Sequence, residues 1–364
     1  MPMKTLNYAA TALLVVLTFY LLIIGEKLLL PLVIGIVLWY LINTLADLFG
    51  QIAIGSIGIP KPLCLAASLL TFVLMVWALV SFLSSNFDEV LEVVPVYQEN
   101  LTTRLDNIPL LEFLGPQEEI LESITDWIDL PVFAASLATS FAGILASSGL
   151  ILIYIGFLFL EQGHFDKKIS ALVANREREA DIRTIIDRIR GDIRKYISIK
   201  VFTSSLTGIL SYIFLKFAGV DFAGVWGLLI FLLNFIPTVG SIIATIFPAM
   251  IALAQSDGYS LFFLVLIGIT VLQICIGQML EPRLMGSSFN LSPIIILLNL
   301  ALWGYIWQVP GMFLCVPFLI ILTIILSHFP STRRIAIILS KDGSLRMPAD
   351  SNFASFSLPK LESD

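Results

Sequence analysis

The sequence predicts an all-α polytopic membrane protein with about eight membrane segments. Hydrophobic residues make up 58% of the 364 residues and charged residues 13%, and the mean hydropathy is +0.95. These values lie outside the range of soluble globular proteins. Several apolar runs also approach or exceed the roughly 20 residues that an α-helix needs to cross a bilayer. Two further apolar runs are longer, and proline and glycine interrupt each of them near its middle.

Six apolar runs read as uninterrupted spans. They are 6–24, 28–46, 62–84, 141–161, 197–217 and 259–280. The first run follows Lys4 and shows no small-residue cleavage pattern before Glu26, so we interpret it as a retained span rather than a signal peptide. The first three spans form a predicted unit over 1–85, and the fourth occupies 141–162.

The two interrupted runs cover 222–255 and 293–328. Each is compatible with a tilted span or with a re-entrant hairpin. In transporters, a pair of interrupted segments is the best sequence pointer to the binding site. We therefore predict a transport core with broken helices over 197–328.

Charge outside the spans predicts the orientation of the chain. Residues 86–140 hold eleven acidic residues against the single Arg104, whereas 163–200 hold ten Lys and Arg against six acids. Cytoplasmic segments carry an excess of Lys and Arg. The rule places 163–196 and the tail, 329–364, in the cytoplasm and 86–140 outside. If Lys4 is cytoplasmic, the three spans that follow it also place 86–140 outside. We therefore predict that both termini are cytoplasmic.

The outer segment, 86–140, is predicted to form an acidic helical cap. Its prolines, which divide it into short helical pieces such as 117–128, are Pro95, Pro109, Pro116 and Pro131. The excess negative charge could repel anions or concentrate cations near an outer mouth. A solvated acidic surface is the simpler explanation, and we favour it.

The cytoplasmic segment, 163–196, contains a predicted amphipathic helix. Its isoleucines recur at three- and four-residue steps, at Ile182, Ile185, Ile186, Ile189, Ile193 and Ile197. This face could lie on the membrane, pack on a neighbouring protomer or pack within its own chain. The acids that interrupt the basic residues argue against nucleic-acid binding. Lys200 follows at the cytoplasmic end of a span, where contact with lipid headgroups is expected. A role in gating is the alternative.

Signatures of enzymes and of cofactor binding are missing from the sequence. It has no G-x-x-x-x-G-K-[ST] loop for nucleotide phosphates and no G-x-S-x-G nucleophile turn. Cys64, Cys275 and Cys315 stand far apart, without the spacing of a disulfide framework or a metal site. We therefore expect no enzyme activity, no cofactor and no bound metal.

Glu281 and Arg283 are the only charged residues between 261 and 326. A charge at bilayer depth costs about 2.5–3.5 kcal/mol on insertion scales, so an intramembrane charge is a functional-site candidate. Glu281 precedes Pro282, which disfavours helical backbone and predicts a broken or terminating helix. We expect Glu281 to bind a proton or a cation, and Arg283 to hold it charged or to meet an anionic substrate group. The alternative is a structural ion pair at a helix end.

The other candidate site residues lie beside the two interruptions. They are Asn234, Pro237, Gly240, Ser292 and Asn299. Broken backbone frees carbonyl groups that can coordinate an ion or a polar solute. Asn234 is favoured as functional because Pro237 frees a carbonyl in the preceding turn. Ser292 stands directly before Pro293, a pattern that favours a helix N-cap.

Six short motifs stand in a characteristic order. They are YISIK at 196–200, VWGLL at 225–229, NFIPTVGS at 234–241, EPRLMG at 281–286, LSP at 291–293 and WG at 303–304. Together they resemble the autoinducer-2 exporter family, a group of permease-like bacterial inner-membrane proteins. The resemblance covers nearly the whole chain. The sequence departs from the family pattern at Gln308, where a glycine is expected.

The resemblance implies a multi-pass exporter of small molecules, such as the quorum-sensing signal autoinducer-2. It also implies that the protein works as a homo-oligomer, a pentamer, in the bacterial inner membrane. It also implies that some relatives are sodium/proton antiporters. Our leading hypothesis is secondary transport that exports a small polar molecule, with H+ or Na+ as the coupling ion. A cation/proton antiporter is the second hypothesis, and an oligomeric scaffold or channel is the third.

Overall fold

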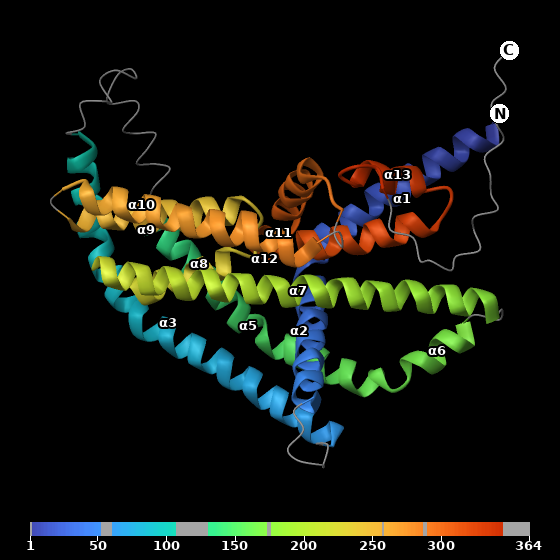
Figure 1. The fold of residues 1–364 in the computed structure, drawn as a ribbon. Coiled ribbons are helices and arrows are strands. Elements are labelled where there is room, and N and C mark those ends of the chain that lie inside the picture. Colours follow the sequence, from blue (N-terminus) through green and yellow to red (C-terminus); the bar gives the residue numbers. More distant parts are fainter. Residues whose placement is uncertain are drawn as a thin grey trace.

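The computed structural model describes residues 2–51, 60–106, 130–172, 176–256, 258–286 and 290–344. In these residues the secondary structure is helical, which confirms the predicted all-α class (Figure 1). The first helices are α1 (Pro2–Ile24), α2 (Glu26–Gln51), α3 (Lys61–Asp106), α5 (Leu130–Gln162) and α6 (Phe165–Leu172). They are followed by α7 (Arg176–Ala218), α8 (Ala223–Leu233), α9 (Val239–Gln255) and α10 (Ser260–Gln273). The π-helix η2 (Ile274–Leu280), α11 (Glu281–Met285), α12 (Pro293–His328) and α13 (Arg333–Leu339) complete the described chain.

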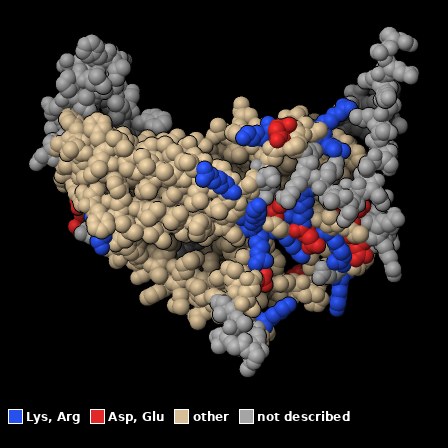
Figure 2. Space-filling view, in the orientation of Figure 1, with Lys and Arg blue, Asp and Glu red and all other residues tan. Residues whose placement is uncertain are grey.

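Five helices in the described residues are long and apolar enough to cross a membrane. They are Glu26–Gln51, Lys61–Phe82, Glu179–Ala218, Ser260–Met285 and Pro293–His328. Charged side chains gather at one end of the molecule, around α6, α13 and the N-terminal half of α7, whereas the surface over α9 and α10 is largely uncharged (Figure 2). This separation is the one expected for a chain with a lipid-facing body and a polar end.

The long helix α7 organises the structure. It contains 43 residues, about 65 Å of helix at 1.5 Å per residue, and it crosses the predicted boundary between 196 and 197 without interruption. Ile185, Ile189 and Ile193 of its N-terminal half pack against a buried cluster that includes Leu291 and Leu319. The isoleucine face therefore packs, at least in part, within its own chain.

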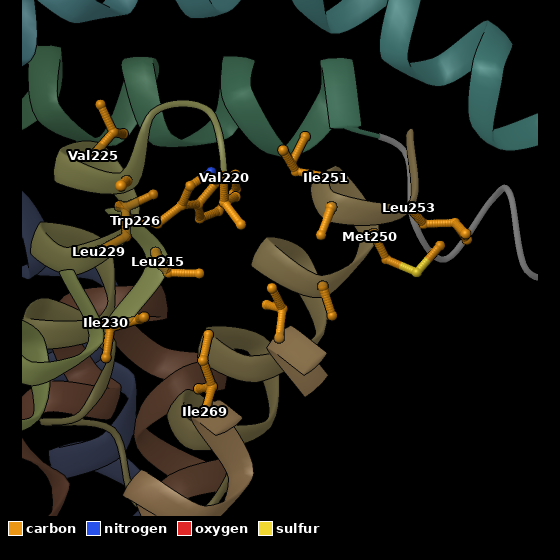
Figure 3. Packing of buried hydrophobic residues seen from close by; sticks show 14 of the residues in the cluster. Leu215, Val220, Val225, Trp226, Leu229, Ile230, Met250, Ile251, Leu253 and Ile269 are labelled. Atoms are coloured by element: carbon orange, nitrogen blue, oxygen red, sulfur yellow. The ribbon is translucent and has the colours of Figure 1, made fainter. Parts of the chain in front are cut away.

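The helices α7, α8, α9 and α10 follow one another as antiparallel neighbours (Figure 1). A Cβ atom added at Gly208 of α7 would lie 2.8 Å from the carbonyl oxygen of Gly227 in α8. A side chain larger than hydrogen would push the two helices apart at this crossing. The cluster beneath the crossing contains Leu215, Trp226 and Ile230 (Figure 3).

The first interrupted region, 222–255, folds as a helical hairpin. Its first helix, α8, has 11 residues, about 17 Å of helix, which is too short for a hydrocarbon core of about 30 Å. The chain then turns through 234–238, and α9 packs back against α8. A Cβ atom at Gly240 would lie 1.8 Å from the carbonyl oxygen of Leu233, so this turn requires glycine.

The second interrupted region, 293–328, also folds back on itself. The helical backbone of α12 breaks at Trp307 and Gln308, and Gln308 has φ 52° and ψ −137°. Asn299 donates a hydrogen bond of 2.5 Å to the carbonyl oxygen of Cys315, 16 residues further on. On a straight helix these residues would be about 24 Å apart. Both interrupted regions therefore fold back on themselves.

The outer segment differs from the prediction at its first proline. Pro95 was expected to end a helical piece, but α3 continues through it to Asp106, so that expectation is wrong. A proline removes one backbone hydrogen bond and bends a helix, and the long flanking turns of α3 retain theirs. Pro131 lies in the first turn of α5, where proline fits a helix. The predicted piece 117–128 lies outside the described residues, as do Pro109 and Pro116.

The tail returns to the start of α12. The backbone N–H of Ser292 donates to the carbonyl oxygen of Leu339 at 3.0 Å, and the N–H of Lys341 donates to that of Asn290 at 3.2 Å. The side chain of Asn290 also donates to Asp342 and to the backbone of Ser344. Hydrogen bonds from Ser344 and Asn290 lower the pKa of Asp342 to about 2. The Asp342 carboxylate therefore remains a charged acceptor across the physiological pH range.

We predict that Gln308→Gly stabilises the protein. A side chain at φ 52° is strained, and relief of this strain should raise the free energy of unfolding by about 1 kcal/mol after the greater freedom of glycine in the unfolded chain is counted. Thermal unfolding in detergent measures the change. The control, Gln278→Gly within η2, should lower the stability by about 1 kcal/mol because that position is helical. An unchanged or lower stability of Gln308→Gly would contradict the strain.

Candidate functional site

Glu281 lies at the junction of η2 and α11, in the last turns of the helical stretch that begins at Ser260. Its own backbone is helical, with φ −58° and ψ −49°. The α-helix nevertheless changes to a π-helix directly before Glu281 and ends at Met285, so the predicted broken or terminating helix is confirmed. Proline clashes with the carbonyl group four residues before it, and we attribute the wider turns of the π-helix to this clash. Gly286, with φ 57°, follows the end of the helix.

Glu281 forms a buried ion pair with Lys200 of α7. The Lys200 Nζ atom lies 2.8 Å from Oε1 and 3.0 Å from Oε2 of Glu281. Thr203 Oγ1 donates a third hydrogen bond of 3.1 Å to Oε2. The side chains of Lys200 and Glu281 are only 8% and 13% exposed. Burial of either charge alone would be costly, and the pair with its added hydroxyl satisfies both groups.

The partner of Glu281 is not the one that the sequence suggested. Arg283 is exposed on α11, and Lys200 binds the carboxylate instead. The expectation that Lys200 contacts lipid headgroups is also wrong, because its side chain is buried. The available signal was the row of hydroxyl residues that follows Lys200 at helical spacing in an otherwise apolar segment. That row predicts a polar face but does not say what lies opposite.

This polar face of α7 connects the ion pair to the first hairpin. Four hydroxyl residues recur on this face at helical spacing and are at most 1% exposed. They are Thr203, Ser204, Thr207 and Ser211. Asn234, which lies at the end of α8, is 6% exposed and donates a hydrogen bond of 3.0 Å to Ser204 Oγ. Asn234 and Glu281 therefore contact adjacent residues of α7.

Pro237 and Gly240 shape the turn that follows Asn234. In this turn Ile236 is buried in the same cluster as Tyr196 and Ile197, which lie one turn before Lys200 on α7. The first interruption is thus held against the part of α7 that carries the ion pair. Sequence analysis selected these residues individually, and the structure brings them to one region.

Ser292 and Asn299 make their hydrogen bonds within the second hairpin and the tail, beside the buried cluster that also contains Ile236 and Tyr196. Ser292 occupies the N-cap position of α12, as predicted, but its side chain makes no capping hydrogen bond. Its N–H group bonds to Leu339 in the tail. Asn299 joins the two arms of the second hairpin through Cys315. The hydrogen bonds described for these two residues therefore hold the second hairpin and the tail together, and none of them reaches Glu281.

A second polar contact lies at the opposite end of α7. Tyr97, in the part of α3 that follows its apolar segment Lys61–Phe82, donates a hydrogen bond of 2.5 Å to Asp221 in the loop between α7 and α8. Gln255 at the end of α9 accepts a hydrogen bond from the N–H of Asp221 and donates one to the carbonyl oxygen of Gly219. Burial, together with the hydrogen bond and charge of Asp221, raises the pKa of Tyr97. This part of α3 is thereby tied to the ends of α7 and α9.

Comparison with known proteins identifies the family. The family model described as AI-2E family transporter matches residues 11–331. The chain belongs to this family. The AI-2 transport protein TqsA of Escherichia coli (strain K12) is 30% identical over 286 residues, which cover 78% of this chain and 82% of TqsA. A putative transport protein of Haemophilus influenzae is 29% identical and covers 77% of this chain and 82% of its own length.

Family membership makes this AI-2E protein a multi-pass membrane transporter and confirms the resemblance drawn from its motifs. Among the described residues, no group of three or more His, Cys, Asp or Glu side chains could hold a metal ion. The chemistry available at the site is that of one carboxylate, one ammonium group and neighbouring hydroxyl and amide groups. A proton or cation that takes over the Glu281 carboxylate displaces Lys200, which then needs another acceptor.

We predict strong energetic coupling between Lys200 and Glu281. Lys200→Met and Glu281→Met should each lower the free energy of unfolding by about 3 kcal/mol, because each leaves one buried charge unpaired, whereas the double variant should recover most of this loss. Reversible unfolding of the four proteins in detergent gives the coupling energy.

The exposed pair of Arg194 and Asp47 supplies the control. These side chains are 40% and 63% exposed at an N–O distance of 3.3 Å, and their coupling should be below about 1 kcal/mol. Strictly additive effects of Lys200→Met and Glu281→Met would show that the buried pair contributes no mutual stabilisation.

Proposed function

We propose that this AI-2E protein is an ion-driven secondary transporter that exports a small polar molecule. Glu281 is the group that binds the coupling ion, H+ or Na+, and Lys200 is its internal counter-ion. The buried ion pair is the observation that carries the proposal. An intramembrane carboxylate paired with a buried ammonium group is a typical element of ion and substrate pathways. Autoinducer-2 is the first candidate solute because TqsA is named for AI-2 transport.

Ion binding and solute binding compete for Lys200 in this mechanism. In the described state Lys200 and Thr203 both donate to Glu281. When H+ or Na+ binds Glu281, the carboxylate no longer needs the ammonium group, and Lys200 turns to an oxygen atom of the solute. Asn234 and Ser204, on the same face of α7, offer further hydrogen-bonding groups there. The protein then binds the solute with a different affinity when the ion occupies Glu281 than when it does not, as any coupled transport cycle requires.

The same carboxylate gives the second candidate function, cation/proton antiport, a structural basis. The oxygen atoms of Glu281 and the Thr203 hydroxyl lie together, and oxygen ligands of this kind suit a hard cation such as Na+. An antiporter would exchange H+ and Na+ at Glu281 without an organic solute.

The described N-terminal half of α7 packs within its own chain, so the isoleucine face supplies no specific support for the scaffold hypothesis.

The proposed setting is the bacterial inner membrane, with both termini in the cytoplasm and several copies of the chain in a homo-oligomer, a pentamer by the family resemblance. The distribution of charge supports the orientation, because α6, α13 and the N-terminal half of α7 lie at the same end of the molecule (Figure 1). These segments contain the basic residues that the positive-inside rule places in the cytoplasm.

The role suggested for Arg283, contact with an anionic substrate group, stays a prediction.

Transport by purified protein in liposomes tests the proposal. Labelled autoinducer-2 and an internal pH dye report solute and proton movement under imposed proton and sodium gradients. Glu281→Gln should reduce gradient-driven movement of autoinducer-2 at least about tenfold, since loss of one essential charged interaction of about 1.4 kcal/mol or more has this effect.

The matched control is Glu161→Gln, which makes the same change at an exposed side chain at the end of α5 and should transport like the native protein. Sodium-driven proton movement without autoinducer-2 transport would replace the exporter with the antiporter. Native rates in Glu281→Gln would remove Glu281 from either mechanism.

A further inference from the structure

Several buried polar groups in the described part of the transport core have no hydrogen-bond partner, and two of them lie on α7 and α10, next to the segments that form the ion pair. These two are the Oγ atom of Ser211 in α7 and the Nε2 atom of Gln273 at the end of α10. Ser211 is fully buried, and Gln273 is 8% exposed. Neighbouring hydroxyl groups behave differently, because Thr207 and Thr270 each donate to the backbone carbonyl one turn earlier. Unpaired buried polar groups cost stability and are rare in native structures, so this pair calls for an explanation.

Both groups are adjacent to an apolar cluster that α7 and α10 share. Leu215 of α7 and Val265 and Ile269 of α10 are fully buried in this cluster (Figure 3). Ser211 lies one helical turn before Leu215, and Gln273 lies one turn after Ile269, on the same buried face of α10. Each group is therefore placed at the border of the apolar contact between the two helices.

Because α7 and α10 are antiparallel, Ser211 and Gln273 both lie on the side of this apolar contact that faces the ion pair. At one point the Phe214 ring lies within 2.2 Å of a Cβ atom added at Gly268. At the other, Lys200 binds Glu281. Ser211 lies between these two contacts along α7, and Gln273 lies between them along the continuous stretch of α10, η2 and α11. The polar face that begins at the ion pair therefore continues inward as far as Ser211 and Gln273.

We propose that Ser211 and Gln273 form an inner binding subsite for an uncharged, oxygen-bearing part of the transported solute. The proposal rests on the proposed transport function. The Nε2 atom of Gln273 is a donor only, so it requires an acceptor oxygen and cannot bind a cation. The Ser211 hydroxyl both donates and accepts, which suits a hydroxyl or carbonyl group of the solute. This subsite differs in charge from the ion site at Glu281.

The two sites are successive stations for a small molecule. Eleven residues of helix separate Lys200 from Ser211, about 17 Å of rise, too far for one small solute to bridge. The π-helix connects the stations, since Gln273 directly precedes η2 and Glu281 directly follows it. A change of η2 toward α-helical geometry would rotate these two side chains relative to each other. Ion binding at Glu281 can thereby change the position of Gln273.

Thiol labelling tests whether polar solutes reach the subsite. In a background in which Cys64, Cys275 and Cys315 are replaced by alanine, Ser211→Cys should react with a membrane-impermeant methanethiosulfonate in liposomes. The matched control is Leu215→Cys, one turn further along the same face. The expected result is labelling of Ser211→Cys at least about tenfold faster, because the solute path includes that position and ends before the apolar cluster. Equal rates would overturn the subsite.

Transport and stability together test the role of Gln273. Gln273→Leu should reduce autoinducer-2 movement at least about tenfold, while the melting temperature stays equal or rises by about 2 °C, because an unpaired buried amide is removed. Gln278→Leu, the same change at an exposed position of η2, should leave both unchanged. Native transport in Gln273→Leu, or a melting temperature that falls together with transport, would overturn the binding role.

The two measurements separate this inference from the proposed function. If the native protein moves no autoinducer-2, the proposed solute is wrong, whereas the thiol rates still decide whether Ser211 lies on a polar path. If autoinducer-2 is transported and Ser211→Cys reacts no faster than Leu215→Cys, the exporter stands and the inner subsite is rejected.

Discussion

The structure of the transport core depends on the need to neutralise Glu281 away from water. An isolated charge in a medium of low dielectric constant is costly, so the carboxylate must meet a cation at hydrogen-bond distance. Lys200 satisfies this need at 2.8 Å, which requires α7 and the junction of η2 and α11 to stay in register. The close approach of Gly208 and Gly227 then holds α8 on the same helix. One electrostatic constraint thus aligns three helical segments.

The two hairpins are a second consequence of the same environment. Non-helical backbone at membrane depth persists only where protein groups cover it. The first turn lies against α7 through Asn234 and Ser204, and the arms of the second are joined by Asn299 and Cys315. Buried amide groups therefore have a structural role at both breaks. The amide at the first break bonds to Ser204, which is adjacent to Thr203 of the ion-pair site.

The helix α7 connects regions of different chemistry. Its N-terminal half packs through isoleucines, its middle carries the ion pair and the hydroxyl face, and the loop after its end binds Tyr97 through Asp221. Because the helix is continuous, displacement at one contact reaches the others as a rigid-body movement or as a rotation. One long helix therefore physically connects the buried ion pair with the contact between α3 and the loop that follows α7.

The sequence by itself determined the membrane class, the two interruptions and Glu281 as an unusual charge. These features follow from composition, local hydropathy and the backbone preferences of proline and glycine, all of which act over short stretches of chain. Tertiary structure alone decided that both interruptions are hairpins, and that Glu281 pairs with Lys200, 81 residues away, rather than with Arg283. Apolar periodicity is compatible with many arrangements of the same helices, and the partner of a buried group depends on which faces meet.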